Sequence, residues 1–407
     1  MDSETRKRWR WNPDLRVARE TRGGEEVAVL HDPAHDEYFQ LGIVEFELAQ
    51  AFDGTRDLEA VRLARAAHGS EPPSLENLVT FAEQLAEAHL LLPVEGAHAP
   101  DAFAPRPRPR RTWWRRLLHI EIAALRPETF FDRLAPHLRW FFSAPAFAAG
   151  TGLVLMATWV VLGSWGQLRS GLSSISTEAP WVVVWILYGM VVVVHEMAHG
   201  FACAHFGGRV RAMGFLLLYG KPCAYCDVSD AWLLPKSARL WIMAAGSLVE
   251  LGMWAAAALV WRVTAPETLL HRGALVILAL CGVGTLLNFN PLLKFDGYYM
   301  LSDGLEIPNL RERAFRDLGR RFLHRPRDPA TARERRVFWI YGVAALAYST
   351  LVIGFLAARL HGWMVSTWGT AGSFAFWGTV SAVAARPLFR STTLVVAWLR
   401  GVSRSRR

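Results

Sequence analysis

Long runs of uncharged, mostly apolar residues alternate with arginine-rich segments along the chain after residue 139. The runs occupy positions 140–168, 179–194, 240–249, 251–261, 273–293, 337–358 and 362–385. A helix that crosses a bilayer needs about 20 such residues, and the two short runs on either side of Glu250 together make one such helix. The pattern therefore predicts an α-helical polytopic membrane protein with about six transmembrane helices.

The polar first part of the chain has a different period. "EEVAVL" and "EYFQLG" alternate apolar and polar residues, as strands with one buried face do. The turn-rich "HDPAHD" between them predicts a hairpin. The spacing then becomes helical, with Thr55 or Asp57 as the cap of a second helix. Strands followed by helices predict a small α+β winged-helix domain at 1–95.

Charge sets the expected orientation. The chain has a formal net charge of +9, with 52% hydrophobic and 20% charged residues. Lys and Arg are abundant in alternate segments, which are 104–139, 207–239, 294–336 and 386–407, and scarce in the loops between them. Because Lys and Arg stay on the cytoplasmic side, we expect both termini in the cytoplasm and an inner (cytoplasmic) membrane location. Topology and contact with the lipid bilayer explain the basic charge.

The remaining boundaries follow from composition. Residues 96–139 begin with the Pro/Arg-rich linker "GAHAPDAFAPRPRPRR", which cannot bury a core. The Trp- and Arg-rich rest of that segment predicts an amphipathic helix at the membrane interface. The membrane domain is expected at 140–390, and 391–407 at the end form a basic cytoplasmic tail. The first residues lack the apolar core of a cleavable signal peptide.

Two histidines and a glutamate stand at the end of the second apolar run, in "VVVVHEMAHG". On a helix His195 and His199 share one face, about 6 Å apart along the axis, so both imidazoles can bind one zinc ion. Glu196 beside them can act as general base on a metal-bound water. Ionisable residues inside a span are rare and usually functional. Zinc binding is therefore favoured over histidines that only pack inside the bundle.

Catalytic zinc needs a third protein ligand, and the sequence offers two candidates. His205 follows His199 at the spacing of a metzincin ligand, but Ala202 stands where that motif needs a chain-breaking glycine. Asp296 comes after the fourth span, beyond a helix break at Pro291. Both spans are expected to run inward to similar depths, so this break can return Asp296 to the histidines. The depth argument favours Asp296.

These motifs together resemble the site-2 protease family of intramembrane zinc metalloproteases. The resemblance rests on "HEMAH" paired with "NFNPLLKFDG" and covers about 140–390. It implies that His195, His199 and Asp296 bind a zinc ion, that Glu196 is the catalytic base and that Asn288 helps to hold substrate. "AYCDVSDAW" and "FNPLLKFDGYYMLSD" most resemble the bacterial branch of peptide zinc metalloproteases.

The N-terminal part resembles the PqqD-like domains that bind leader sequences of ribosomally made peptides. The resemblance rests on "DPAHDEYFQLG", the helix after it and "FDGTRDLEAV". It implies a peptide-recognition domain at 1–95. A generic winged helix that serves for packing or for DNA contact is the alternative. The helices at 43–90 carry few basic residues, so no nucleic acid is expected as a partner.

Two features leave alternatives open. Gly246-Ser247 and Glu250 stand where site-2 proteases often have Gly-Pro and then Asn, and Glu250 is expected either to pair within the bundle or to lie near the site. The C-x-x-C pair Cys223 and Cys226 lacks a second pair, so loop cysteines are favoured over a metal site.

The expected function is that of an integral-membrane zinc metalloendopeptidase that cleaves a peptide or a membrane-protein substrate near the cytoplasmic face, in peptide maturation or export. The alternative is a membrane scaffold for peptide export or maturation without essential proteolysis, although a scaffold has no need of Glu196. Because the chain ends after the predicted spans, any export or adaptor protein is expected to be a separate partner.

Overall fold

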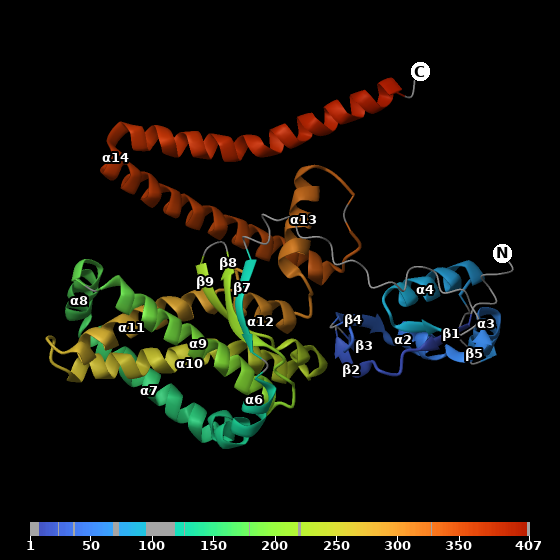
Figure 1. Cartoon of the computed structure of the whole chain (residues 1–407), viewed down its shortest axis with the longest axis horizontal. Helices are drawn as coiled ribbons and strands as arrows, with labels where there is room; N and C mark the ends of the chain where they lie inside the picture. The colour runs from blue at the N-terminus through green and yellow to red at the C-terminus, as the bar shows by residue number, and fades with distance from the viewer. Residues whose placement is uncertain are drawn as a thin grey trace. The chain divides into compact units, whose positions relative to one another are not determined.

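A computed structural model describes the backbone of residues 8–404, except 23, 36, 68–72, 95–118, 126, 179, 219–220 and 327. The predicted linker at 96–111 therefore lies outside the described residues. The chain forms two compact units, Met1–Pro308 and Asn309–Arg407. The first unit contains the N-terminal strands and helices as well as the helices α6 to α12 (Figure 1).

The N-terminal part combines two small antiparallel sheets with helices. One sheet has the strand order β2-β3-β4 and the other β5-β1-β6. The elements are β1 (Arg8–Trp11), β2 (Arg16–Arg22), β3 (Glu25–Asp32), β4 (Glu37–Gly42), α2 (Ile43–Gln50), β5 (Asp53–Asp57), α3 (Leu58–Ala67), α4 (Leu75–Glu87) and β6 (Leu91–Pro93). Apolar side chains from both sheets and all three helices enclose one core, which includes Leu30, Phe46 and Leu78.

The predicted hairpin is confirmed, because β3 and β4 pair antiparallel from Val27 with Gly42 to Asp32 with Glu37. β3 is the central strand of its sheet, and its last six residues are all buried. Asp57, one of the two expected caps, caps α3: its Oδ1 accepts the backbone N–H of Ala60 at 2.9 Å. The region is thus an α+β domain, and its winged-helix class stays a prediction.

Five helices in the described part of the chain are long and apolar enough to cross a membrane. They are α7 (Ala144–Gly163), α9 (Trp181–His205), α10 (Lys236–Val263), α11 (Leu269–Asn288) and the segment Ala332–Ser381 of α14 (Ala332–Arg404). A shorter helix, α8 (Trp165–Glu178), follows α7. In the first unit α10 contacts α7, α9 and α11, so it is the central helix of this group.

The last two predicted spans are not separated where the sequence placed a loop. Positions 337–358 and 362–385 both lie in α14, and the predicted loop at 359–361 is helical, so that prediction is wrong. The helix bends at Gly369 instead, where φ is 61° and ψ is −139°, a conformation that glycine adopts without steric strain. Figure 1 shows α14 folding back, and α13 (Leu310–Phe322) packs against it. The count of six spans stays a prediction.

A third antiparallel sheet stands where the sequence predicted an interfacial helix and a loop. Its strands, in the order β7-β8-β9, are β7 (His119–Leu125), β8 (Met213–Leu218) and β9 (Lys221–Cys226). The helix expected from residue 112 onward is therefore wrong at 119–125, since pairing with a distant strand outweighs the local pattern. Among the described residues of this segment, α6 (Glu128–Leu134) and the 3-10 helix η2 (Ala135–Phe142) keep the predicted helical character. The C-x-x-C cysteines lie in a strand, not in a loop.

Charged side chains join the N-terminal sheet to the segment between β9 and α10. Asp230, in the 3-10 helix η3 (Ser229–Leu233), is 1% exposed and accepts hydrogen bonds from Arg16, Arg211 and Tyr38. Burial opposes ionisation of Asp230, but the hydrogen bonds and charges of the two arginines outweigh it and lower the pKa of that carboxyl. A second ion pair joins Glu20 of β2 to Arg239 of α10.

Candidate metal centre

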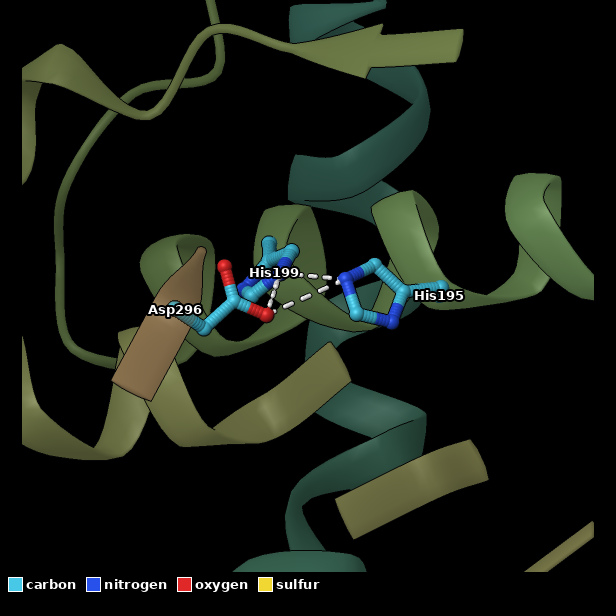
Figure 2. A group of neighbouring side chains, drawn as sticks. All are labelled: His195, His199 and Asp296. Atoms are coloured by element: carbon cyan, nitrogen blue, oxygen red, sulfur yellow. Dashed lines mark hydrogen bonds and ion pairs between the residues drawn. The ribbon is translucent and has the colours of Figure 1, made fainter. Parts of the chain in front are cut away.

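Helix α9 carries both histidines of the "HEMAH" motif. The helix is continuous through the motif, and His195 and His199 are buried at 7% and 8% exposure. Because four residues separate them, the two side chains leave the same face of the helix. Their Nε2 atoms lie 3.0 Å apart, and Figure 2 shows the two rings beside the carboxylate of Asp296.

Asp296 reaches the histidines because the chain breaks after α11. That helix ends at Asn288, the following segment contains Pro291, and α12 (Asp296–Gly304) begins with Asp296 itself. Oδ2 of Asp296 lies 3.2 Å from Nε2 of His195 and 3.5 Å from Nε2 of His199. The structure thus brings Asp296 to two histidines that lie about 100 positions earlier in the chain.

The three ligand atoms have the spacing of a tetrahedral zinc site. Zinc binds histidine nitrogen and carboxylate oxygen at about 2.0–2.2 Å, which places atoms at neighbouring tetrahedral corners about 3.3 Å apart. The observed separations of 3.0, 3.2 and 3.5 Å lie close to this value. In the described residues this is the one group of three or more His, Cys, Asp or Glu side chains with such spacing.

Hydrogen bonding decides which ring nitrogen faces the group. Nδ1 of His199 lies 2.7 Å from the backbone oxygen of Ile242. A carbonyl oxygen only accepts, so Nδ1 carries the proton and Nε2 presents its lone pair. Nδ1 of His195 lies 3.1 Å from a carboxylate oxygen of Glu250, so the Nε2 atoms of both rings are directed toward Asp296. Two ring lone pairs and a carboxylate oxygen of Asp296 therefore converge, which fits a divalent cation with nitrogen and oxygen ligands such as zinc.

Helix α10 lies close to the two rings because position 246 is glycine. A Cβ at Gly246 would lie 2.5 Å from Nε2 of both histidines, which is too close for any side chain. The next residue, Ser247, is fully buried and donates a long hydrogen bond of 3.5 Å to Oδ2 of Asp296. The Gly-Ser pair that departs from the family pattern therefore lines the candidate centre.

Glu196 lies beside the three ligands and is not one of the group. Its half-buried carboxylate is hydrogen-bonded by the backbone N–H of Cys226 on β9. Burial, and to a lesser degree the charge of Glu196, raises the pKa of the Cys226 thiol, which keeps that thiol neutral. A carboxylate next to the ligands but outside the ligand set is placed as a general base must be.

Two other residues that the sequence singled out lie outside the group. The ring of His205 stacks on Phe142 with centroids 4.2 Å apart, so the metzincin alternative has no support from the geometry. Asn288 donates from Nδ2 to Oε2 of Glu250 at 3.3 Å. Glu250 thus belongs to the surroundings of the site and not to a remote pair. The sequence by itself left both places for Glu250 open, and no motif indicated the carbonyl of Ile242.

Comparison with known proteins gives one partial similarity to report. The chain is 24% identical over 180 residues to "Putative peptide zinc metalloprotease protein YydH" of Bacillus subtilis (strain 168). The match covers 44% of this chain and 66% of that protein, so it spans just under two thirds of the relative. No family model matches the chain, and no solved structure matches it. The similarity supports a zinc metalloprotease-like family.

Proposed function

We propose that this chain is an intramembrane zinc metalloendopeptidase of the site-2 protease type. The observation that carries the proposal is the convergence of His195, His199 and Asp296 among apolar helices, with Glu196 alongside. The name of the relative, a peptide zinc metalloprotease, points to the same chemistry. The substrate is a peptide or a membrane-associated protein, cleaved near the cytoplasmic face of the inner membrane.

The roles of the residues follow from their positions. Zinc bound by the two histidines and Asp296 would supply a Lewis acid that polarises a peptide carbonyl and acidifies a bound water. Glu196 takes the proton of the attacking water and delivers it to the leaving amine. The backbone N–H of Cys226 holds the carboxylate of Glu196 in place, and the carbonyl of Ile242 keeps Nε2 of His199 unprotonated.

The proposal extends to the rest of the chain. The Lys/Arg bias of the loops supports an orientation with both termini in the cytoplasm. The N-terminal domain is proposed to recognise the peptide that is cleaved, in line with its resemblance to PqqD-like domains. Asn288 is proposed to contact substrate, since it lies at the end of α11, eight positions before α12 begins with Asp296.

The substitution Glu196→Gln tests the mechanism. It removes the base and keeps the side chain's shape, so cleavage of a model transmembrane peptide should fall by about 10²–10⁴-fold. Zinc content, measured by elemental analysis of detergent-purified protein, should stay at the wild-type level. Retained turnover would refute the role of Glu196. A zinc-loaded wild type that cleaves neither model nor cognate peptides would instead favour the scaffold alternative.

A further inference from the structure

Glu250 is a carboxylate buried in the middle of a membrane-spanning helix. It is 4% exposed and belongs to α10, between two uncharged runs. An ionised carboxylate at such a depth is unfavourable unless other groups compensate its charge. In the part of the chain that the structure describes, no Lys or Arg pairs with it. Its compensation must therefore come from other residues.

Two side chains contact Glu250, one from the candidate centre and one from the end of α11. Oε1 lies 3.1 Å from Nδ1 of His195, and Oε2 accepts from Nδ2 of Asn288 at 3.3 Å. α11 packs closely on the carboxylate, since a Cβ at Gly284 would lie 2.9 Å from Oε2. The carboxylate is thus held between a histidine on α9 and an amide on α11.

A single face of α10 serves both histidines. Ile242, Gly246 and Glu250 follow one another at intervals of four residues, so they lie along one side of the helix. Ile242 offers its carbonyl oxygen to Nδ1 of His199, and Gly246 leaves room for both rings. Glu250 occupies the equivalent position with respect to His195.

Nδ1 of His195 and Oε1 of Glu250 lie within ion-pair distance, but they do not have the geometry of an aligned hydrogen bond. The buried Nδ1 has no hydrogen-bond partner of good geometry in the structure, although Oε1 is the oxygen that faces it. A histidine that binds a metal through one nitrogen usually donates the other N–H to a carboxylate, carbonyl or water. His199 already has such an acceptor, and Glu250 is placed to be the one for His195.

We propose that Glu250 is a positioning residue that accepts the Nδ1–H of His195 and so fixes the ring with Nε2 directed at the metal. The carboxylate keeps the ring in the required tautomer and makes Nε2 a better electron donor. Asn288 in turn orients Glu250 through its amide group. This inference rests on the proposed function, since it requires that His195 bind zinc.

Two substitutions in the full-length, detergent-purified protein test the inference. Glu250→Gln keeps the size and an oxygen acceptor but removes the charge, and Glu250→Leu removes the acceptor. Zinc affinity, measured by competition with a chromophoric chelator, should fall by about 10–100-fold in Glu250→Gln. It should fall further in Glu250→Leu. The visible absorption of the cobalt(II)-substituted protein should shift in both variants, because the donor strength of His195 changes.

Thr285→Val is the matched control. Thr285 of α11 is buried like Glu250 and lies one turn before Asn288, and its Oγ1 has no hydrogen-bond partner among the described residues. This variant should keep the wild-type zinc affinity and cobalt spectrum. Thermal unfolding of the metal-free proteins shows whether a substitution disturbs packing. A packing defect lowers stability without metal, whereas loss of a positioning contact lowers zinc affinity.

The outcomes distinguish this inference from the proposed function. Unchanged zinc affinity and cobalt spectrum in Glu250→Gln, with lower stability of the metal-free protein, would overturn the role of Glu250 and leave zinc proteolysis standing. A wild type that binds no zinc would defeat the proposed function first. If Glu250→Leu fails to fold, Glu250→Gln still decides the matter.

Discussion

Two buried polar clusters each include a carboxylate of helix α12, and they differ in how their charge is balanced. In the first, Arg239 is 1% exposed and donates from Nε to both carboxylate oxygens of Asp303, at 3.0 and 3.1 Å. Its Nη1 and Nη2 each donate to Glu20 at 2.7 Å, and Nη1 also donates to the carbonyl of Leu234. Every nitrogen of the guanidinium has an acceptor, so the cluster is complete.

In the second cluster the side chains offer lone pairs to one another. Nε2 of His195, Nε2 of His199 and Oδ2 of Asp296 all lie within 4.8 Å of one another. Atoms that only accept repel at this range unless a cation or a proton lies between them. A complete cluster stabilises the fold, whereas a cluster of converging acceptors indicates a ligand. The comparison shows why two polar clusters that share one helix have different roles.

The largest expected effect concerns the complete cluster. Arg239→Met removes the cation, which leaves the buried carboxylate of Asp303 without it and Glu20 with Arg22 alone. Loss of one member of a buried ion pair typically reduces the free energy of unfolding by about 3–5 kcal/mol. Unfolding of the metal-free protein in detergent measures the loss. Arg22→Met is the control, because Arg22 also pairs with Glu20 but Arg239 remains to compensate it.

If Arg239→Met unfolds as the wild type does, the cluster contributes no stability, and the contrast between the two clusters does not hold. Equal losses in Arg239→Met and Arg22→Met would show that the contact with Asp303 adds nothing to the contact with Glu20.

The next largest effect concerns the converging acceptors. Asp296→Ala removes one proposed ligand. Residues that only orient ligands contribute up to about 100-fold in metal affinity, so loss of a ligand should weaken zinc binding by at least about 100-fold. His205→Ala should leave zinc content unchanged, because that ring stacks on Phe142 and lies outside the group. Elemental analysis of both variants, with His195→Ala as the positive control, gives the answer. Full zinc in Asp296→Ala together with loss in His205→Ala would reverse the assignment.

The smallest effect is a dependence on acid. Burial opposes ionisation of Glu20, but the hydrogen bond and charge of Arg239 outweigh this effect and lower the pKa of Glu20. Arg16 and Arg211 lower the pKa of Asp230 in the same manner. A carboxyl with a lowered folded pKa stabilises the fold above its ordinary pKa of about 4. That stability is lost as pH falls through the folded value. The effect is smaller than that of Arg239→Met, because a protonated carboxyl still forms hydrogen bonds.

The stability of the metal-free protein should therefore fall below about pH 4, and Glu20 should account for part of this loss. The metal-free form is used because acid also protonates the histidines. Glu20→Gln should start less stable and lose less on acidification. A variant with the full acid sensitivity of the wild type would show that Glu20 does not contribute to it.

The sequence by itself determined the features that depend on local period. Apolar runs predicted the helices α7, α9, α10 and α11, and alternation predicted the hairpin of β3 and β4. The four-residue spacing of His195 and His199 was enough to place both rings on one face, because helix geometry relates them directly. A proline before Asp296 also indicated where the chain could return to them.

Only the tertiary structure decided features whose partners lie far away in the chain. Residues 119–125 form a strand because β8, about 90 positions later, offers a pairing edge. The bend of α14 occurs at Gly369, because glycine adopts a positive φ without steric strain and this conformation interrupts the helix. The loop predicted at 359–361 contains no glycine and is helical.

The same distinction holds inside the candidate site. The sequence allowed two interpretations of Glu250, a pair within the bundle or a place near the site. A carboxylate on an apolar helix has no local partner that reveals its role. Packing of α9, α10 and α11 brings Glu250 to His195 and Asn288, which are 55 and 38 positions away. Electrostatic contacts depend on distance in space, so the fold alone could show which ring this carboxylate faces.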